Sequence, residues 1–159
     1  MSSESSVVLT TRSPEETERL GEALARLMPT GGTVALRGEL ASGKTCFVRG
    51  MARAVAGDPS IHSPTFTLIN EYGSARKLFH LDLYRLGSID EVAELGVEEL
   101  FDSASICAVE WAERAELLLP AKRVDVHFDH AGEDRRTIEI GDRGMLAPGW
   151  RETIRDLQV

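Results

Sequence analysis

Polar caps followed by apolar residues at helical spacing predict two well-defined helices. The first opens at residues 13–16 (SPEE), a capping box with proline at the first helical position, and leucine and alanine then recur through Met28. The second opens with the capping box at residues 88–91 (SIDE), and Gly96 limits its length. Two shorter helical segments are predicted over residues 112–119 and 150–157.

Apolar runs and alternating segments predict strands between these helices. Residues 33–36 and 105–109 are continuous apolar runs, typical of parallel strands buried on both faces. Alternating segments at 65–72 with 77–84, and at 124–128 with 136–140, predict two hairpins. The sum is a three-layer α/β fold, a mixed sheet with parallel core strands and antiparallel hairpin additions. Because no repeat or linker divides the chain, we expect one domain over residues 1–159, with residues 1–6 disordered.

A phosphate-binding loop lies between the first apolar strand and the helix predicted to follow it, residues 44–55. The pattern G-x-x-x-x-G-K-[ST] is met by Gly38, Glu39, Leu40, Ala41, Ser42, Gly43, Lys44 and Thr45. Backbone N–H groups of such a loop converge on phosphate at the positive end of the helix. Lys44 is predicted to reach the β- and γ-phosphates and Thr45 to bind Mg²⁺. We include the next residue, Cys46, in the nucleotide-binding segment, although we interpret its thiol as a packing group.

The expected nucleotide is ATP or ADP, because the N-K-x-D sequence that reads guanine in most GTPases does not occur in the chain. Such a site also needs carboxylates beside the metal. Glu110 ends an apolar strand that can lie beside the loop's strand, so it is a candidate metal ligand or water-orienting group. Asp82 shares a strand face with His80 and Tyr84, which is either a site or the solvated side of a hairpin. Thr65 lies in a segment suited to sensing the γ-phosphate.

Composition limits the possible locations, partners and structural metals of the protein. The 159 residues are 42% hydrophobic, and neither a membrane span nor a secretory signal is found in the sequence, so we expect a cytoplasmic protein with no membrane partner. Its net charge of −8 opposes direct binding to nucleic acid. The two cysteines suggest buried thiols in a reducing compartment, and the four histidines lack the spacing of a structural zinc site.

Together these motifs resemble the bacterial TsaE (YjeE) family of ATPases, which take part in threonylcarbamoyladenosine formation in tRNA. The resemblance covers about residues 13–140 and is carried by the loop with its continuation at 47–50 and by three blocks, SPTFTLINEY at 63–72, HLDLYRL at 80–86 and VEW at 109–111. It implies slow ATP hydrolysis with Mg²⁺, coupled to the partners TsaD and TsaB, which alone would contact tRNA. It also implies that Lys44 holds phosphate, that Thr45 and Glu110 serve the metal, and that Asp82 and Thr65 are further active-site residues, with Trp111 near the nucleotide.

The loop departs from the usual family form, G-D-L-G-A-G-K-T-T, at Glu39, Ala41, Ser42 and Cys46. All fixed positions of the phosphate-loop pattern remain, so we expect nucleotide binding to be kept. Two alternatives from other classes stay open: a small-molecule kinase, and a nucleotide-dependent binding module without relevant hydrolysis. The segment 11–17 and the turn at Arg135 and Arg136 are candidates for contacting adenine.

Overall fold

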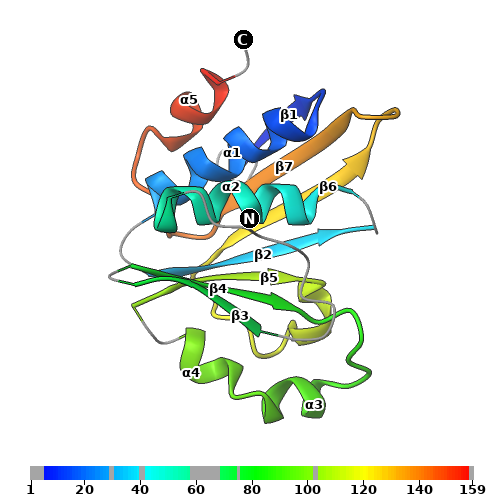
Figure 1. The fold of residues 1–159 in the computed structure, drawn as a ribbon, viewed down its shortest axis with the longest axis vertical. Coiled ribbons are helices and arrows are strands. Elements are labelled where there is room, and N and C mark those ends of the chain that lie inside the picture. The colour runs from blue at the N-terminus through cyan, green and yellow to red at the C-terminus, as the bar shows by residue number, and fades with distance from the viewer. Residues whose placement is uncertain are drawn as a thin grey trace.

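The computed structural model describes residues 6–28, 31–39, 42–57, 69–74, 76–101 and 104–157. Within these ranges one mixed sheet has seven strands in the order β1-β7-β6-β2-β5-β4-β3 (Figure 1). The elements along the chain are β1 (Ser6–Thr11), α1 (Pro14–Leu27), β2 (Gly32–Gly38), α2 (Lys44–Ala56), β3 (Ile69–Gly73), β4 (Lys77–Asp82), α3 (Ile89–Glu94), α4 (Val97–Phe101), β5 (Ile106–Glu110), the 3₁₀ turn η2 (Ala112–Ala115), β6 (Val124–His130), β7 (Arg136–Asp142) and α5 (Trp150–Arg155).

Two apolar cores lie on the two faces of the sheet. Strand β2 shows the division, because Val34 and Leu36 belong to the core under α1, α2 and α5, whereas Ala35 belongs to the core under α3, α4 and η2. Helices α1 and α2 run side by side over the sheet, with α5 beyond α1 and with α3 and α4 at the opposite end (Figure 1). The predicted three-layer α/β class is confirmed.

The parallel core is larger than the sequence indicated. Strand β2 pairs in parallel with β5 on one side and with β6 on the other, and β4 also pairs in parallel with β5. The hairpins β3–β4 and β6–β7 are antiparallel, as predicted, yet each donates one strand to this core. The carboxyl ends of β2, β5 and β4 therefore meet at one edge of the sheet, where ligands of open α/β sheets bind.

The predicted helix caps are confirmed. The hydroxyl of Ser13 accepts a hydrogen bond from the Glu16 amide at 3.1 Å, and the hydroxyl of Ser88 accepts one from the Glu91 amide at 3.3 Å. Gly96, with a φ of +75°, separates α3 from α4. These local signals hold because each satisfies a backbone N–H that the first helical turn leaves unpaired.

Two expectations from the sequence are wrong. Residues 112–119 do not form a helix: only the 3₁₀ turn η2 is present, and the backbone enters it through Trp111 with a left-handed φ of 59°. Strand β1 was not predicted, and Ser6, expected to be disordered, is its first residue. Pairing with β7 stabilises β1, which buries Val7 and Leu9 on one face. Among the described helices, none has the length and apolar character needed to cross a bilayer.

Candidate functional site

The phosphate loop joins the end of β2 to the start of α2, as the motif predicts. At Gly38, which has a φ of +147°, a Cβ atom would lie 2.7 Å from the Phe128 carbonyl oxygen and 2.8 Å from Oγ of Ser42. Gly43 caps α2 with a left-handed φ of 108°. Both glycines are therefore required, by close approach and by backbone conformation. The motif's Leu40 and Ala41 lie outside the described residues.

Lys44 is buried inside the loop. Its side chain is 4% exposed, and Nζ donates hydrogen bonds to the carbonyl oxygens of Gly38 and, at 3.1 Å, Glu39. The same ammonium lies 4.1 Å from the ring centroid of Trp111, a cation–π contact. The ammonium is thus surrounded by partial negative charge, which is the environment that phosphate oxygens would provide.

Burial and charge act in opposite directions on this ammonium. Desolvation lowers the pKa of Lys44 below its usual 10.5, and the nearby carboxylates of Glu110, Glu113 and Asp82 partly oppose that effect. Three acidic side chains therefore act on the lysine from the same edge of the sheet. No ion pair joins Lys44 to another described residue, so its ammonium can neutralise phosphate charge without first leaving a carboxylate partner in that part of the chain.

The two predicted carboxylates are brought together beside the loop. Glu110 ends β5 and pairs in register with Asp82 of β4 and with Leu36 of β2. The hydroxyl of Thr45, at the start of α2, donates a 3.3 Å hydrogen bond to Oε2 of Glu110. Asp82 is not on the solvated side of an isolated hairpin, because β4 lies within the parallel core. The arrangement brings a hydroxyl and two carboxylates to one place.

These groups fit a nucleotide with Mg²⁺. The hydroxyl of Ser42 is 1% exposed and has no hydrogen-bond partner among the residues described, so it offers a buried polar group to a phosphate-bearing ligand. Hydroxyl and carboxylate oxygens are the ligands that Mg²⁺ prefers, and at nucleotide sites it takes one or two of them together with phosphate and water. The described ranges hold no set of three His, Cys, Asp or Glu side chains that could hold a metal ion by themselves.

Two aromatic side chains stand over the site. Trp111 packs against Tyr84 in a tilted arrangement, with ring centroids 4.9 Å apart and planes inclined at 46°. The left-handed backbone at Trp111 directs its ring back over Lys44 instead of continuing β5. Such a conformation is costly for a residue with a Cβ atom, so the surrounding contacts must hold it in place. Trp111 therefore forms one wall of the site.

Sequence reasoning missed the part played by His80. It placed this residue on the polar face of the strand with Asp82 but gave it no role. The imidazole is fully buried, and its Nε2 lies 2.5 Å from Oε2 of Glu110. The available signal was the alternation His80-Leu-Asp82, which places both polar side chains on the face that α2 covers. Thr65, the predicted switch residue, lies outside the described residues.

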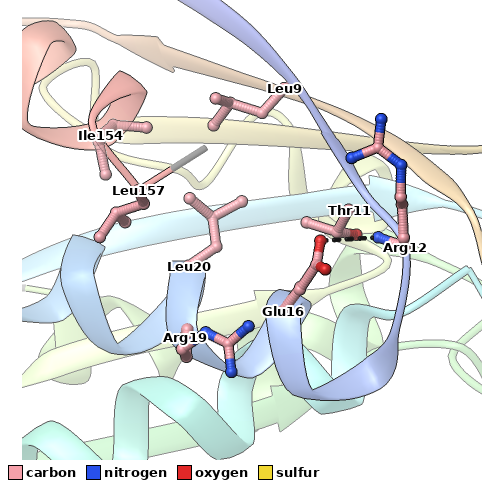
Figure 2. A pocket seen from close by; sticks show the side chains of 8 residues that line it. All are labelled: Leu9, Thr11, Arg12, Glu16, Arg19, Leu20, Ile154 and Leu157. Atoms are coloured by element: carbon pink, nitrogen blue, oxygen red, sulfur yellow. Dashed lines mark hydrogen bonds between the residues drawn. The ribbon is translucent and has the colours of Figure 1, made fainter. Parts of the chain in front are cut away.

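The candidates for contacting adenine lie on the flank of the loop. Thr17 shares a buried 2.7 Å hydroxyl–hydroxyl bond with Thr11, and its methyl group lies 3.6 Å from where a Cβ of Gly43 would stand. The Arg136 side chain comes within 3.9 Å of the same point. Next to this flank a cavity of about 290 Å³ opens between β1, α1 and α5, with Arg12 and Arg19 among the residues lining it (Figure 2).

The two cysteines differ in environment, and only one is fully buried. Cys46 is half-buried at the start of α2, 3.8 Å from Nη1 of Arg49. Cys107 is buried in β5 and donates a hydrogen bond to the Leu100 carbonyl at 3.3 Å. The expectation of two buried thiols is therefore correct for Cys107 and only partly so for Cys46.

We predict that Cys107 resists alkylation in the native protein. Burial raises the pKa of its thiol to about 12, so at pH 8 roughly one molecule in ten thousand carries the reactive thiolate. Iodoacetamide followed by peptide mass spectrometry should modify Cys46 alone, and unfolding in guanidinium should make Cys107 equally reactive. Rapid native modification of Cys107 would contradict the buried position of β5.

The fold and the loop define this chain as a P-loop NTPase-like protein: a parallel core, a glycine-bounded loop at the end of its central strand, and a helix that begins with Lys44 and Thr45. The family model "Threonylcarbamoyl adenosine biosynthesis protein TsaE" matches residues 11–138. The chain belongs to this TsaE family.

Individual relatives support the same assignment. TsaE of Aquifex aeolicus is 42% identical over 134 residues, covering 80% of this chain and 90% of the relative. TsaE of Treponema pallidum is 37% identical over 129 residues, covering 81% of this chain and 96% of the relative. The crystal structure of YdiB from Bacillus subtilis superposes with a TM-score of 0.72 at 30% identity and covers 96% of this chain and 93% of that one. The resemblance inferred from the motifs is confirmed.

Proposed function

We propose that this chain binds and hydrolyses ATP with Mg²⁺ during threonylcarbamoyladenosine biosynthesis, and that hydrolysis drives or resets a TsaD–TsaB complex that transfers the threonylcarbamoyl group to tRNA. The observation that carries the proposal is the meeting of Thr45, from the loop helix, with Glu110, from the end of a parallel strand, at 3.3 Å. Family membership supports the pathway, because the relatives are named as tRNA threonylcarbamoyladenosine biosynthesis proteins.

In this proposal Lys44 moves from the loop carbonyls to the β- and γ-phosphates. The Lys44 ammonium remains hydrogen-bonded, because its bonds to the carbonyl oxygens of Gly38 and Glu39 are replaced by bonds to anionic phosphate oxygens. The backbone of the loop and the N-terminus of α2 complete the cradle. Trp111 excludes water from one side of the ammonium.

Thr45 and Glu110 serve the metal, with Asp82 beside them as a further carboxylate. Bound Mg²⁺ would neutralise charge on the γ-phosphate as it is transferred to water. The Thr45 hydroxyl and the Glu110 carboxylate, which share a hydrogen bond, would hold the metal, and Glu110 could instead orient the attacking water. Because Glu110 is 3% exposed, its carboxylate acts in a largely water-excluded place.

The surface charge of the chain agrees with an indirect role towards tRNA. Its net charge is −8, and phosphate neutralisation by Lys and Arg supplies most affinity for nucleic acid. We therefore assign tRNA contact to the partners TsaD and TsaB and place the chain in the cytoplasm with them. Adenine is assigned to the flank formed by Thr17 and Arg136.

The decisive experiment is reconstituted tRNA modification with TsaD and TsaB. Threonylcarbamoyladenosine is quantified by nucleoside mass spectrometry with this chain added, omitted, or replaced by Lys44→Ala. We expect product beyond one turnover per complex only with the unaltered chain, together with partner-stimulated phosphate release. Modification that is independent of the chain would contradict the proposal, and nucleotide binding without any stimulated phosphate release would favour the binding module. Transfer of phosphate to a metabolite would favour the kinase.

A further inference from the structure

The buried imidazole of His80 contacts the same carboxylate that we assign to the metal. Its side chain is fully buried in β4, beneath α2, and Nε2 lies 2.5 Å from Oε2 of Glu110. Strand β4 pairs in parallel with β5, and His80 stands opposite Ala108, two residues before Glu110. The imidazole therefore reaches the carboxylate along one face of two adjacent strands, both within the parallel core of the sheet.

His80 donates the hydrogen in this contact when Glu110 is the ionised, metal-side carboxylate of the proposed function. An ionised carboxylate oxygen can only accept, so Nε2 then carries the hydrogen. The other ring nitrogen, Nδ1, is buried and has no hydrogen-bond partner within the described part of the chain. Burying an unpaired ring nitrogen is costly, and a residue that served only to fill the core would avoid that cost if it were leucine or methionine. The contact with Glu110 is what compensates for placing an imidazole here.

Within the described residues, Oε2 of Glu110 receives two hydrogen bonds, and the proposed function affects only one of them. One comes from the Thr45 hydroxyl at 3.3 Å, a group that the proposed function reassigns to the metal. The other comes from His80, which is fully buried in β4. If Thr45 binds the metal, His80 is the described residue that still donates a hydrogen bond to Oε2. Its N–H then fixes the rotamer of Glu110.

We propose that His80 is a positioning residue that donates its Nε2–H to Oε2 of Glu110 and so holds that carboxylate in the orientation required beside Mg²⁺ and the attacking water. The inference rests on the proposed function, because it gives His80 a task only if Glu110 serves the metal site. Partners that orient a metal-side carboxylate typically change metal affinity or activity about 10- to 100-fold when removed. His80 itself touches neither nucleotide nor metal in this proposal.

The test compares three variants of the full chain. His80→Leu removes the donor, whereas His80→Gln keeps an N–H near the position of Nε2. Leu78→Val is the matched control for packing, since Leu78 is fully buried on the same face of β4. We expect His80→Leu to lower kcat about 10- to 100-fold and to raise the half-saturating Mg²⁺ concentration, with the His80→Gln variant recovering most of both. Leu78→Val should leave both kcat and the half-saturating Mg²⁺ concentration unchanged, even if it lowers the melting temperature as much as His80→Leu does.

Equilibrium binding separates positioning from a general loss of structure. By calorimetry, His80→Leu should bind ATP in EDTA as tightly as the unaltered chain but gain less affinity when Mg²⁺ is added. If His80→Leu keeps the kcat and Mg²⁺ dependence of the unaltered chain, or if Leu78→Val reproduces its defects at equal stability, the positioning role is wrong.

A measurement on the nucleotide-free chain covers the case in which His80→Leu does not fold. Long-range ¹H–¹⁵N NMR of the imidazole should show Nε2 protonated and Nδ1 bare, and the Nε2 signal should shift in Glu110→Gln. A ring protonated at Nδ1 alone would overturn the inference. This result is independent of nucleotide chemistry: failure of the proposed function would instead appear as unchanged ATP binding in Lys44→Ala, whatever the His80 spectrum shows.

Discussion

Lys44→Ala is expected to weaken ATP binding by roughly 30- to 1,000-fold, or about 2–4 kcal/mol, because it removes a charged donor from a water-poor loop. The fold should persist. The Lys44 ammonium donates its hydrogen bonds to loop carbonyls and lies over the Trp111 ring, so the side chain is not part of either apolar core. Titration calorimetry with ATP and Mg²⁺ measures the loss, and circular dichroism checks the fold.

The matched control for this variant removes the same charge elsewhere. Lys77→Ala deletes an exposed lysine whose partner is Glu71, at 3.3 Å, on the neighbouring edge strand. It changes the net charge as Lys44→Ala does, and it should leave ATP affinity unchanged. If both variants lose affinity equally, long-range charge explains the effect and the loop lysine has no specific role.

Glu110→Gln is expected to slow hydrolysis about 100- to 1,000-fold while ATP affinity changes little. The amide keeps the shape of the side chain and still accepts from His80, but it loses the negative charge that we propose orients water or holds the metal. Single-turnover phosphate release at saturating ATP measures the chemical step, and calorimetry measures affinity in parallel.

Glu113→Gln is the control for charge near the lysine. Glu113 acts on Lys44 electrostatically, as Glu110 does, yet no hydrogen bond or ion pair joins its side chain to Thr45 or His80 in the described structure. We expect its hydrolysis rate to stay close to that of the unaltered chain. A wild-type rate in Glu110→Gln would remove Glu110 from the chemistry and assign the task to Asp82.

Sequence motifs correctly predicted the features that depend on residues close together in the chain. The cap at Ser13 could be predicted because its hydroxyl binds an amide three residues later. Gly38 and Gly43 could be predicted because the loop needs backbone conformations that favour glycine. The position of Glu110 was also predictable, since a polar residue that ends an apolar run reaches the carboxyl edge of a parallel sheet.

The features that sequence reasoning missed depend on partners distant in the chain. Strand β1 exists because β7, some 130 residues later, pairs with it from Ser6↔Gly141 to Thr11↔Arg136. The 3₁₀ turn after Trp111 replaces a predicted helix because the Trp111 ring turns back over Lys44, 67 positions earlier in the numbering. The contact of His80 with Glu110 depends on the parallel pairing of β4 with β5, which a hairpin pattern does not reveal.

The placement of β2 between β5 and β6 links ligand binding to completion of the chain. A fragment ending before Ile106 holds every loop residue but neither of the strands that flank β2. A nucleotide that recognises only the finished sheet would add about 2.7 kcal/mol of stability at a concentration one hundred times its dissociation constant. Such a ligand would act as a late check on folding, favouring molecules that are fully synthesised and correctly paired over truncated ones.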